Sequence, residues 1–204
     1  MDEDAARAWI ASLPGVSRET LDRLDRYAAR LIAENQAQNL IASASERIIW
    51  SRHFADSCQL APLACGNVLD VGSGAGLPGI PLAILGFCVT LVEPRRRRAD
   101  FLLGTVEQLG LEARVLPIRV ERVTDSPFDT IVARAYAPLD RVFASVAHLA
   151  HHGTRWVLPK GRSGPAELEN ARRAWHGDFE TIPSITDPDA VIIIARRVRP
   201  KAKR

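Results

Sequence analysis

Residues 68–81 read VLDVGSGAGLPGIP, an apolar run that contains one acidic residue, Asp70, and then becomes rich in glycine. The apolar run predicts a buried strand with Asp70 near its carboxyl end. Glycine costs about 0.5–1 kcal/mol relative to alanine inside a regular element. The four glycines Gly72, Gly74, Gly76 and Gly79 therefore predict a turn whose backbone another group approaches closely.

Short apolar segments alternate with segments of helical length from residue 67 onward. The predicted strands are Val68–Val71, Val89–Val92, Arg114–Ile118, Thr130–Ala133, Thr154–Leu158, Phe179–Pro183 and Val191–Arg196. The segments between the first five strands are long enough for helices, such as Arg97–Leu109 and Leu139–Ala150, which predicts parallel βαβ units in a doubly wound sheet. The link 184–190 is too short for a crossover helix, so the last two strands should form an antiparallel hairpin.

This layout predicts an α/β fold of the Rossmann-like class I methyltransferase type, with a seven-stranded, mostly parallel sheet and an antiparallel C-terminal hairpin. Residues 2–65 should form a helical N-terminal extension packed on that sheet. One helix is expected over Glu19–Leu31, where apolar residues share one helical face and Ser17 is a suitable N-cap, and another over Glu46–Leu60. We expect residues 1–204 to form a single domain.

The composition favours a cytoplasmic protein. The chain has 27 Lys and Arg against 24 Asp and Glu, and its last ten residues hold six of the basic residues. We expect the segment 196–204 to be a disordered basic tail that contacts RNA phosphates. The three cysteines Cys58, Cys65 and Cys88 form no CxxC pair and are interpreted as buried thiols of a reduced compartment. No signal peptide or membrane span is predicted.

The residues around the glycine turn indicate which ligand it binds. Gly74–Gly79 satisfies GxGxxG, which also occurs in dinucleotide-binding folds. Asp70, just before the first glycine, would repel a pyrophosphate but attract an ammonium or sulfonium centre. Glu93 ends the next strand, where a carboxylate can bind ribose hydroxyls in either fold. A P-loop is excluded because no Gly-Lys-Ser/Thr follows, and the remaining alternative is a tight turn without a ligand.

Several blocks together resemble one family. DVGSGAGLPGIPLAI (70–84) with VEP (92–94) is similar to motif I of S-adenosylmethionine-dependent methyltransferases and its companion. With NLIAS (39–43), RHFADS (52–57), RVERV (119–123), FDTIVARAYAPL (128–139) and LPKG (158–161), in this order, the chain resembles the RsmG/GidB family of bacterial methyltransferases. The matching blocks extend from about Asn39 to Gly161.

The resemblance implies methyl transfer from S-adenosylmethionine to N7 of a guanine in 16S ribosomal RNA. It places adenine near Val120 and Glu121. The cofactor-binding residues expected from the strand ends and the resemblance together are Asp70, Gly72, Gly74, Gly76, Leu77, Glu93, Val120, Glu121 and Arg134.

The residues themselves can be tested against that reaction. Enzymes that methylate an exocyclic amine resemble one another in an Asp/Asn-Pro-Pro-aromatic motif after the fourth strand. This chain reads ARAYAPL at that position. No cysteine follows the fourth or fifth strand, where methylation of pyrimidine C5 would need a thiolate. Guanine N7 carries a lone pair and needs positioning rather than a base. A 2′-hydroxyl would need a base, and Lys160 is the one lysine outside the last four residues.

Arg134 and Lys160, at the ends of the fourth and fifth strands, are the candidate catalytic residues. Candidate substrate-binding residues are Arg52, His53, Arg97, Arg98 and Lys160. Each basic residue has a structural alternative: Arg134 as a surface arginine at a strand end, 95–98 as a solvated helix start, and Arg52 as a surface partner of Asp56.

No metal site is predicted, because His148, His151 and His152 lack the spacing of metal ligands. The expected partner is 16S ribosomal RNA, as a small ribosomal subunit or an assembly intermediate, bound by a monomer. Two other functions stay open. One is methylation of another RNA atom or of a small molecule, and the other is ribosome binding without catalysis.

Overall fold

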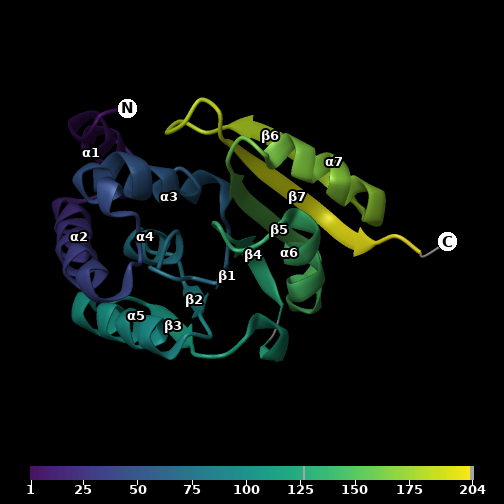
Figure 1. The fold of residues 1–204 in the computed structure, drawn as a ribbon, viewed down its shortest axis with the longest axis horizontal. Helices are drawn as coiled ribbons and strands as arrows, with labels where there is room; N and C mark the ends of the chain where they lie inside the picture. The colour runs from purple at the N-terminus through teal and green to yellow at the C-terminus, as the bar shows by residue number, and fades with distance from the viewer. Residues whose placement is uncertain (126, 203–204) are drawn as a thin grey trace.

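A computed structural model describes residues 1–125 and 127–202, and its centre is a seven-stranded sheet in the order β3-β2-β1-β4-β5-β7-β6 (Figure 1). The strands are β1 Val68–Val71, β2 Val89–Val92, β3 Ala113–Leu116, β4 Phe128–Val132, β5 Ala150–Lys160, β6 Trp175–Pro183 and β7 Val191–Pro200. β1 to β5 pair in parallel, whereas β7 is antiparallel to both β5 and β6. The predicted parallel sheet and C-terminal hairpin are confirmed.

The strands after β4 are longer than their apolar segments indicated. β5 begins four residues before the predicted start, and β7 ends at Pro200 rather than at residue 196. The prediction of a disordered tail from residue 196 is wrong for its first five residues, because Arg196 and Arg199 pair with β6. None of these added residues is buried. Pairing of their backbone with the neighbouring strands, rather than burial of apolar side chains, therefore holds them in the sheet. The end of the tail, 203–204, lies outside the described residues.

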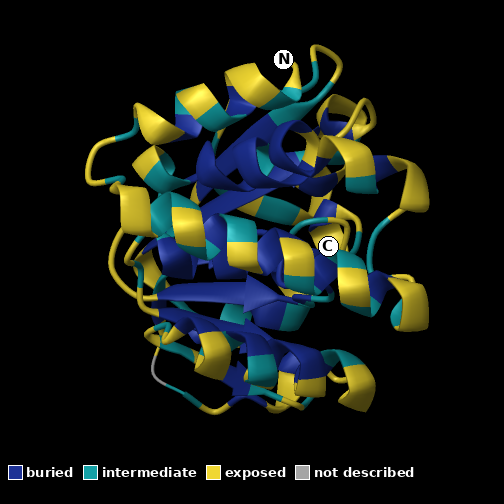
Figure 2. Ribbon diagram, turned by 90° about the vertical axis from the view of Figure 1, so that its left-hand side faces the viewer, coloured by how far each residue is buried: buried dark blue, intermediate teal, exposed yellow. Residues whose placement is uncertain are grey.

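Helices cover both faces of the sheet (Figures 1 and 2). α4 Gly79–Ile84 and α5 Arg96–Leu109 pack on one face together with the N-terminal extension. α6 Leu139–Val146 and α7 Gly164–Ala174 cover the other, over a second core that contains Phe143 and Trp156. The connection between β3 and β4 carries only the short 3-10 helix η4 Val120–Arg122, so the helix expected there is absent from its described residues.

The N-terminal extension consists of α1 Glu3–Ala11, α2 Arg18–Gln38, η1 Ser43–Ile48, η2 Trp50–Ala55, α3 Asp56–Cys58 and η3 Ala61–Leu63. Ser17 caps α2 as predicted, in a capping box with Thr20, and the helix continues to Gln38. The helix predicted over Glu46–Leu60 is present over residues 46–58, but its geometry changes from 3-10 to π to α along the segment.

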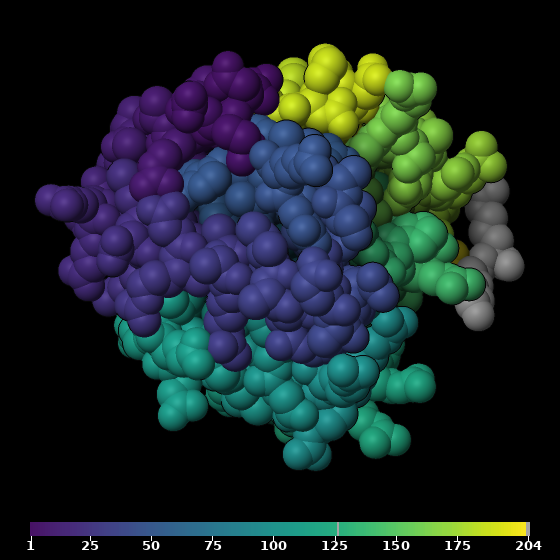
Figure 3. All heavy atoms as spheres, turned by 60° about the vertical axis from the view of Figure 1, so that its left-hand side comes forward, coloured from purple at the N-terminus to yellow at the C-terminus, as the bar shows by residue number. Residues whose placement is uncertain are grey.

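The hairpin loop, residues 184–190 between β6 and β7, lies against this extension. In Figure 3 its yellow surface meets the purple and blue N-terminal residues. Gln59, just after α3, contacts the loop: its Oε1 accepts a hydrogen bond from the Ile185 N–H at 3.0 Å. The first and last parts of the chain therefore meet above the carboxyl ends of the strands.

Two predictions about single features have different outcomes. Cys58 is buried, but Cys65 and Cys88 are exposed, so the expectation of three buried thiols is wrong for two of them. Both exposed thiols lie in connections outside the regular elements, where no core packs around them. Across 1–125 and 127–202, no helix has the length and apolar character that a bilayer crossing requires.

Candidate functional site

The predicted site residues meet at the carboxyl ends of four adjacent strands. Gly72 follows β1, Glu93 follows β2, Arg134 lies two residues after β4, and Lys160 ends β5. The helix after β1 packs on one face of the sheet and the helix after β4 on the other. Ligands of open α/β sheets bind at such a divergence point. We call residues 70–79 with Glu93 the cofactor side, and Arg134 and Lys160 with their partners the acceptor side.

The glycine turn on the cofactor side depends on positive φ angles. Gly72, Gly74 and Gly76 have φ of 67°, 56° and 93°. A Cβ on Gly76 would lie 2.5 Å from an Ile80 side-chain carbon, and one on Gly72 would lie 2.4 Å from the ring of Tyr136. The groups that approach this backbone closely in the structure are the protein's own side chains, at Gly72, Gly76 and Gly79. Approach by a ligand stays a prediction.

Two side chains hold the turn in place. Tyr27 of α2, buried, donates a hydrogen bond from its hydroxyl to the Ala75 carbonyl at 2.7 Å. Glu93, only 4% exposed, accepts from the Gly74 N–H at 2.9 Å and from the Arg95 N–H at 2.8 Å. Each carboxylate oxygen retains acceptor capacity after one such bond. Glu93 is therefore fixed beside the turn, where it could also accept from the hydroxyls of a ribose.

Asp70 lies beneath the turn rather than at its open side. Its side chain is fully buried, Oδ2 accepts from the Gly79 N–H at 3.2 Å, and Oδ1 has no hydrogen-bond partner among the described residues. Burial raises the pKa of Asp70 to about 7. The expectation that this carboxylate faces the ligand is wrong for this geometry, because the carboxylate is turned toward the start of α4.

The other predicted cofactor and RNA contacts are spread around this side. Leu77 is buried in the core, so its side chain does not reach the turn's surface. Val120 is buried and Glu121 exposed in the connection after β3. Arg97 is exposed at the start of α5, while a guanidinium nitrogen of Arg98 would lie 3.7 Å from a Cβ on Gly74. Arg98 is thus close to the turn, and Arg97 faces solvent beside it.

A cleft of about 540 Å³ occupies the acceptor side. It lies between the β4 end, the β5 end, the helix that carries His53, and the hairpin loop. Its lining includes both candidate catalytic residues and two candidate substrate residues: Arg52, His53, Arg134 and Lys160. Arg134 and Lys160 were expected at the same edge of the sheet, and the structure places both in this cleft together with Arg52 and His53.

Arg134 is not a solvated surface arginine. Its Nη1 donates to Asp56 Oδ2 at 3.0 Å, and its Nη2 lies 3.2 Å from His53 Nδ1. The alternative of an Arg52–Asp56 surface pair does not hold, because Arg52 pairs with Asp187 of the hairpin loop at 3.5 Å. Arg52 and Asp56 both contact the hairpin loop, but they take different partners there: Arg52 pairs with Asp187, and Asp56 accepts from the Thr186 hydroxyl.

His53 is buried, with 8% of its surface exposed, although it was predicted to bind substrate. Its Nε2 lies 2.8 Å from Ser45 Oγ, so both ring nitrogens have protein partners. Burial, followed by the charges of Arg134 and Arg52, lowers the pKa of His53 to about 3. The ring is therefore neutral, and its two nitrogens are engaged by the protein.

Lys160 is held by an ion pair and a hydrogen bond. Its Nζ lies 2.9 Å from Glu167 Oε2 and donates to the Ala137 carbonyl at 2.7 Å. Glu167, on α7, has a pKa that is lowered by hydrogen bonds from Lys160 and Ser163, in spite of partial burial that raises it. The side chain of Lys160 is 12% exposed, so it reaches the cleft from a fixed position.

Sequence reasoning missed three residues of the cleft: Asp56 as the partner of Arg134, Glu167 as the partner of Lys160, and Tyr136. Tyr136 follows Ala135, a non-glycine residue with φ of 52°, and is 36% exposed beside Gly72. Its position in ARAYAPL, directly after the fourth strand, was a signal that could have marked it. Asp56 is 78 residues from Arg134, and Glu167 lies on α7, the helix after the strand that Lys160 ends; neither gave such a signal.

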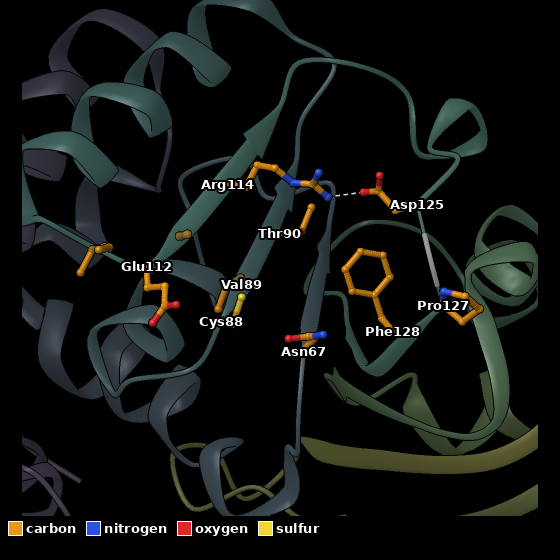
Figure 4. Close-up of a pocket in the computed structure, with 11 residues that line it drawn as sticks. Asn67, Cys88, Val89, Thr90, Glu112, Arg114, Asp125, Pro127 and Phe128 are labelled. Carbon is orange, nitrogen blue, oxygen red and sulfur yellow. Dashed lines mark hydrogen bonds and ion pairs between the residues drawn. The ribbon is translucent and has the colours of Figure 1, made fainter.

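A second cleft, of about 590 Å³, opens at the amino ends of the strands (Figure 4). Arg114 reaches across it to pair with Asp125, and Thr90 and Phe128 line it between them. This cleft is at the other end of β1, β2 and β4 from the glycine turn. Among residues 1–125 and 127–202, no three His, Cys, Asp or Glu side chains gather as a metal site would require.

Comparison with known proteins gives consistent matches. The family described as rRNA small subunit methyltransferase G matches residues 20–188. A "Ribosomal RNA small subunit methyltransferase G" of Rhizorhabdus wittichii is 45% identical, covering 100% of this chain and 96% of its own. A protein of the same name from Zymomonas mobilis is 41% identical, with coverages of 100% and 98%.

Solved structures share the fold at low sequence identity. A glycopeptide N-methyltransferase, MtfA, complexed with S-adenosylmethionine, has a TM-score of 0.59 at 13% identity, covering 70% of this chain and 86% of its own. A ribosomal protein L11 methylase from Lactobacillus delbrueckii has a TM-score of 0.57 at 16% identity, with coverages of 74% and 79%. The predicted Rossmann-like methyltransferase fold is confirmed.

Proposed function

Because the chain belongs to the rRNA small subunit methyltransferase G family, it is an S-adenosylmethionine-dependent methyltransferase of small-subunit ribosomal RNA, and we propose that it methylates N7 of a guanine. The observation that carries the choice of N7 is the state of the acceptor side. Lys160 is engaged by Glu167 and the Ala137 carbonyl, and His53 is neutral, buried and engaged at both nitrogens. Neither group is placed as a free base, and N7 requires none.

The cofactor side fits S-adenosylmethionine in several respects. The turn at Gly72–Gly76 follows the carboxyl end of β1, where Gly74 carries no side chain between the backbone and a ligand, and Glu93 presents a fixed carboxylate for ribose hydroxyls. Val120 and Glu121 are the residues proposed to lie beside adenine. The bound cofactor would supply the methyl group on a positively charged sulfur. Asp70, below the turn, would act on it by holding the backbone at Gly79 rather than by contact.

On the acceptor side, the proposed role of Arg134 is to orient the guanine. N7 must keep its lone pair free for the methyl group, so a guanidinium donor is useful at the neighbouring O6 instead. The proposed role of Lys160 is to fix the position of the base or its phosphate by charge. Alignment of a nucleophile with its target can supply several kcal/mol of the rate acceleration.

The RNA outside the cleft would meet basic residues at its rim. Arg97 and Arg98 flank the cofactor side, and Arg52 flanks the acceptor side. Phosphate contacts of this kind fix register without reading sequence. We propose that the substrate is 16S RNA within a small subunit or an assembly intermediate, and that a monomer acts on it in the cytoplasm.

The test is methyl transfer from labelled S-adenosylmethionine to naked 16S RNA, to small subunits and to assembly intermediates, followed by nucleoside mass spectrometry. We expect 7-methylguanosine in at least one of the three. Label in another methylated nucleoside would show that the acceptor atom is wrong. Cofactor binding with no label in any substrate would favour ribosome binding without catalysis.

A further inference from the structure

We propose that Asp56 and His53, both from the N-terminal extension, are positioning residues that hold the guanidinium of Arg134 in one orientation toward the acceptor cleft. The inference rests on the proposed function for its meaning, since Arg134 is the residue proposed to orient the guanine. What is new is that residues 78 and 81 positions earlier in the chain set the orientation of the Arg134 guanidinium. His53, first expected to bind RNA, acts instead through Arg134.

The first half of this clamp is an ion pair with good geometry. Arg134 Nη1 and Asp56 Oδ2 are 3.0 Å apart, and the two side chains are 18% and 15% exposed. Asp56 Oδ1 is occupied separately, by the Thr186 hydroxyl at 2.9 Å and by Gln59 Nε2 at 3.1 Å. The carboxylate is therefore fixed from one side by the hairpin loop and its own helix, and it presents its other oxygen to Arg134.

The second half of the clamp is a chain of hydrogen bonds that starts at the Ala42 carbonyl, which can only accept, and this sets the donor at each later step. The Ser45 hydroxyl donates to the Ala42 carbonyl at 2.6 Å, so Ser45 Oγ can only accept at His53 Nε2, 2.8 Å away. His53 Nε2 is then the protonated nitrogen, and Nδ1 is left as an acceptor for Arg134 Nη2 at 3.2 Å. The partners thus select the tautomer that receives the guanidinium.

The clamp leaves Arg134 with unused donors. A guanidinium has five N–H groups in one plane. One on Nη1 points to Asp56 and one on Nη2 to His53, so three have no hydrogen-bond partner among the described residues, and Arg134 lines the cleft. Two anchors on different nitrogens fix the plane of the group, which a single ion pair would leave free to rotate.

The test is a double-mutant cycle between Asp56 and Arg134, measured as kcat and KM for methyl transfer to the small subunit. We expect Asp56→Asn to lower kcat at least tenfold with less than a twofold change in S-adenosylmethionine affinity. In an Arg134→Ala background the same substitution should change kcat less than twofold. If the effects of Asp56→Asn and Arg134→Ala multiply, Asp56 acts independently and the proposal is overturned.

Two further variants separate positioning from a structural role. Thr186→Val removes the contact of Asp56 with the hairpin loop and should leave kcat within about threefold of the parent; a loss equal to that of Asp56→Asn would mean that Asp56 serves the loop instead. His53→Asn places an acceptor near the Nδ1 position, whereas His53→Leu removes it. We expect His53→Asn to retain at least tenfold more activity, and equal losses would contradict the proposal. Thermal unfolding identifies any variant that fails to fold.

A spectroscopic measurement is independent of the substrate. Histidine-selective ¹⁵N NMR of the cofactor-free protein at pH 5.5 should show His53, assigned by its loss in His53→Asn, as neutral with its proton on Nε2. A protonated ring, or a proton on Nδ1, would overturn the clamp. Should the wild-type protein form no 7-methylguanosine, the proposed function fails while this spectrum still decides the clamp.

Discussion

The cofactor side and the acceptor side of the site are held in place by different means. On the cofactor side, positive φ angles and backbone N–H groups set the geometry, and Glu93 is 19 residues from its partner Gly74. On the acceptor side, charged side chains set it, and Arg134 is 78 residues from Asp56. A change on the first side should therefore alter the backbone and cofactor binding. A change on the second should alter catalysis on RNA.

The largest effect is expected for Gly76→Ala on the cofactor side. A left-handed conformation costs a residue with a Cβ about 1–2 kcal/mol, and overpacking adds about 1–3 kcal/mol. The new Cβ would meet Ile80 at 2.5 Å and Leu102 at 2.9 Å. We expect a clear loss of stability in denaturant unfolding and loss of cofactor binding by calorimetry.

Gly86→Ala is the matched control for this substitution. Gly86 has φ of 94°, close to the value at Gly76, but a Cβ added there would have no other atom within 4 Å. It should show only the conformational cost, about 1–2 kcal/mol, with normal cofactor affinity. Equal effects of the two substitutions would mean that close contacts at the turn contribute little.

Asp70→Asn should change how stability depends on pH. The folded pKa of Asp70 is raised to about 7, whereas an unfolded Asp titrates near pH 4. The folded protein thus binds a proton that the unfolded chain releases between these values, so this group makes stability fall as pH rises from about 4 to 7.

Asn cannot ionise, so the variant should lack that decline. Its free energy of unfolding relative to the parent should rise by up to about 1.4 kcal/mol per pH unit in this window and become constant above it. Urea unfolding of the cofactor-free proteins between pH 4.5 and 8 measures the difference. If the two curves of unfolding free energy against pH are parallel, Asp70 stays ionised when buried. Any destabilisation by the Asn amide itself is the same at every pH and would not alter the slopes.

Glu93→Gln tests where the cofactor binds. Loss of a charge-assisted hydrogen bond should weaken S-adenosylmethionine binding by about 1–3 kcal/mol in calorimetry. Glu112→Gln, in the cleft at the other end of the strands, is the control and should bind normally. If Glu112→Gln weakens binding and Glu93→Gln does not, the cofactor side has been misplaced.

The smallest effect is expected from removal of residues 202–204, which carry two of the basic residues. If Lys203 and Arg204 contact phosphates, truncation should lower RNA affinity at low salt and reduce the salt slope by at most about 2. Cofactor affinity should not change, since the truncation is remote from the turn in sequence. RNA affinity equal to that of the full chain would show that these residues make no contact.

Much of the cofactor side could be predicted from the sequence because its determinants are local. The strand, the glycines and the acid after the next strand stand in order along the chain, and the structure places Gly72 and Glu93 at adjacent strand ends. The error at Asp70 concerns which way one side chain turns. That depends on α4, whose Gly79 N–H donates a hydrogen bond to the carboxylate. Alternation of apolar residues carries no such information.

For the acceptor side, the sequence predicted which residues lie at the strand ends but not which partners hold them. Sequence placed Arg134 and Lys160 there, but their partners come from η2, α3 and α7 and are set by tertiary packing. The spacing of Arg52 and Asp56 suggested a pair between them, but in the structure each has a tertiary partner, Asp187 and Arg134. Likewise, β7 beyond residue 196 is fixed by pairing with β6 rather than by its own polar residues.

The central claim is that the enzyme positions guanine N7 and removes no proton. The most direct test is the single-turnover rate of methyl transfer to the small subunit between about pH 6.5 and 8.5, for the wild type and Lys160→Arg. The account predicts a rate that is nearly independent of pH, and partial activity for Lys160→Arg because the charge is kept. A rate that rises tenfold per pH unit, with Lys160→Arg as inactive as Lys160→Ala, would contradict it and identify Lys160 as a general base.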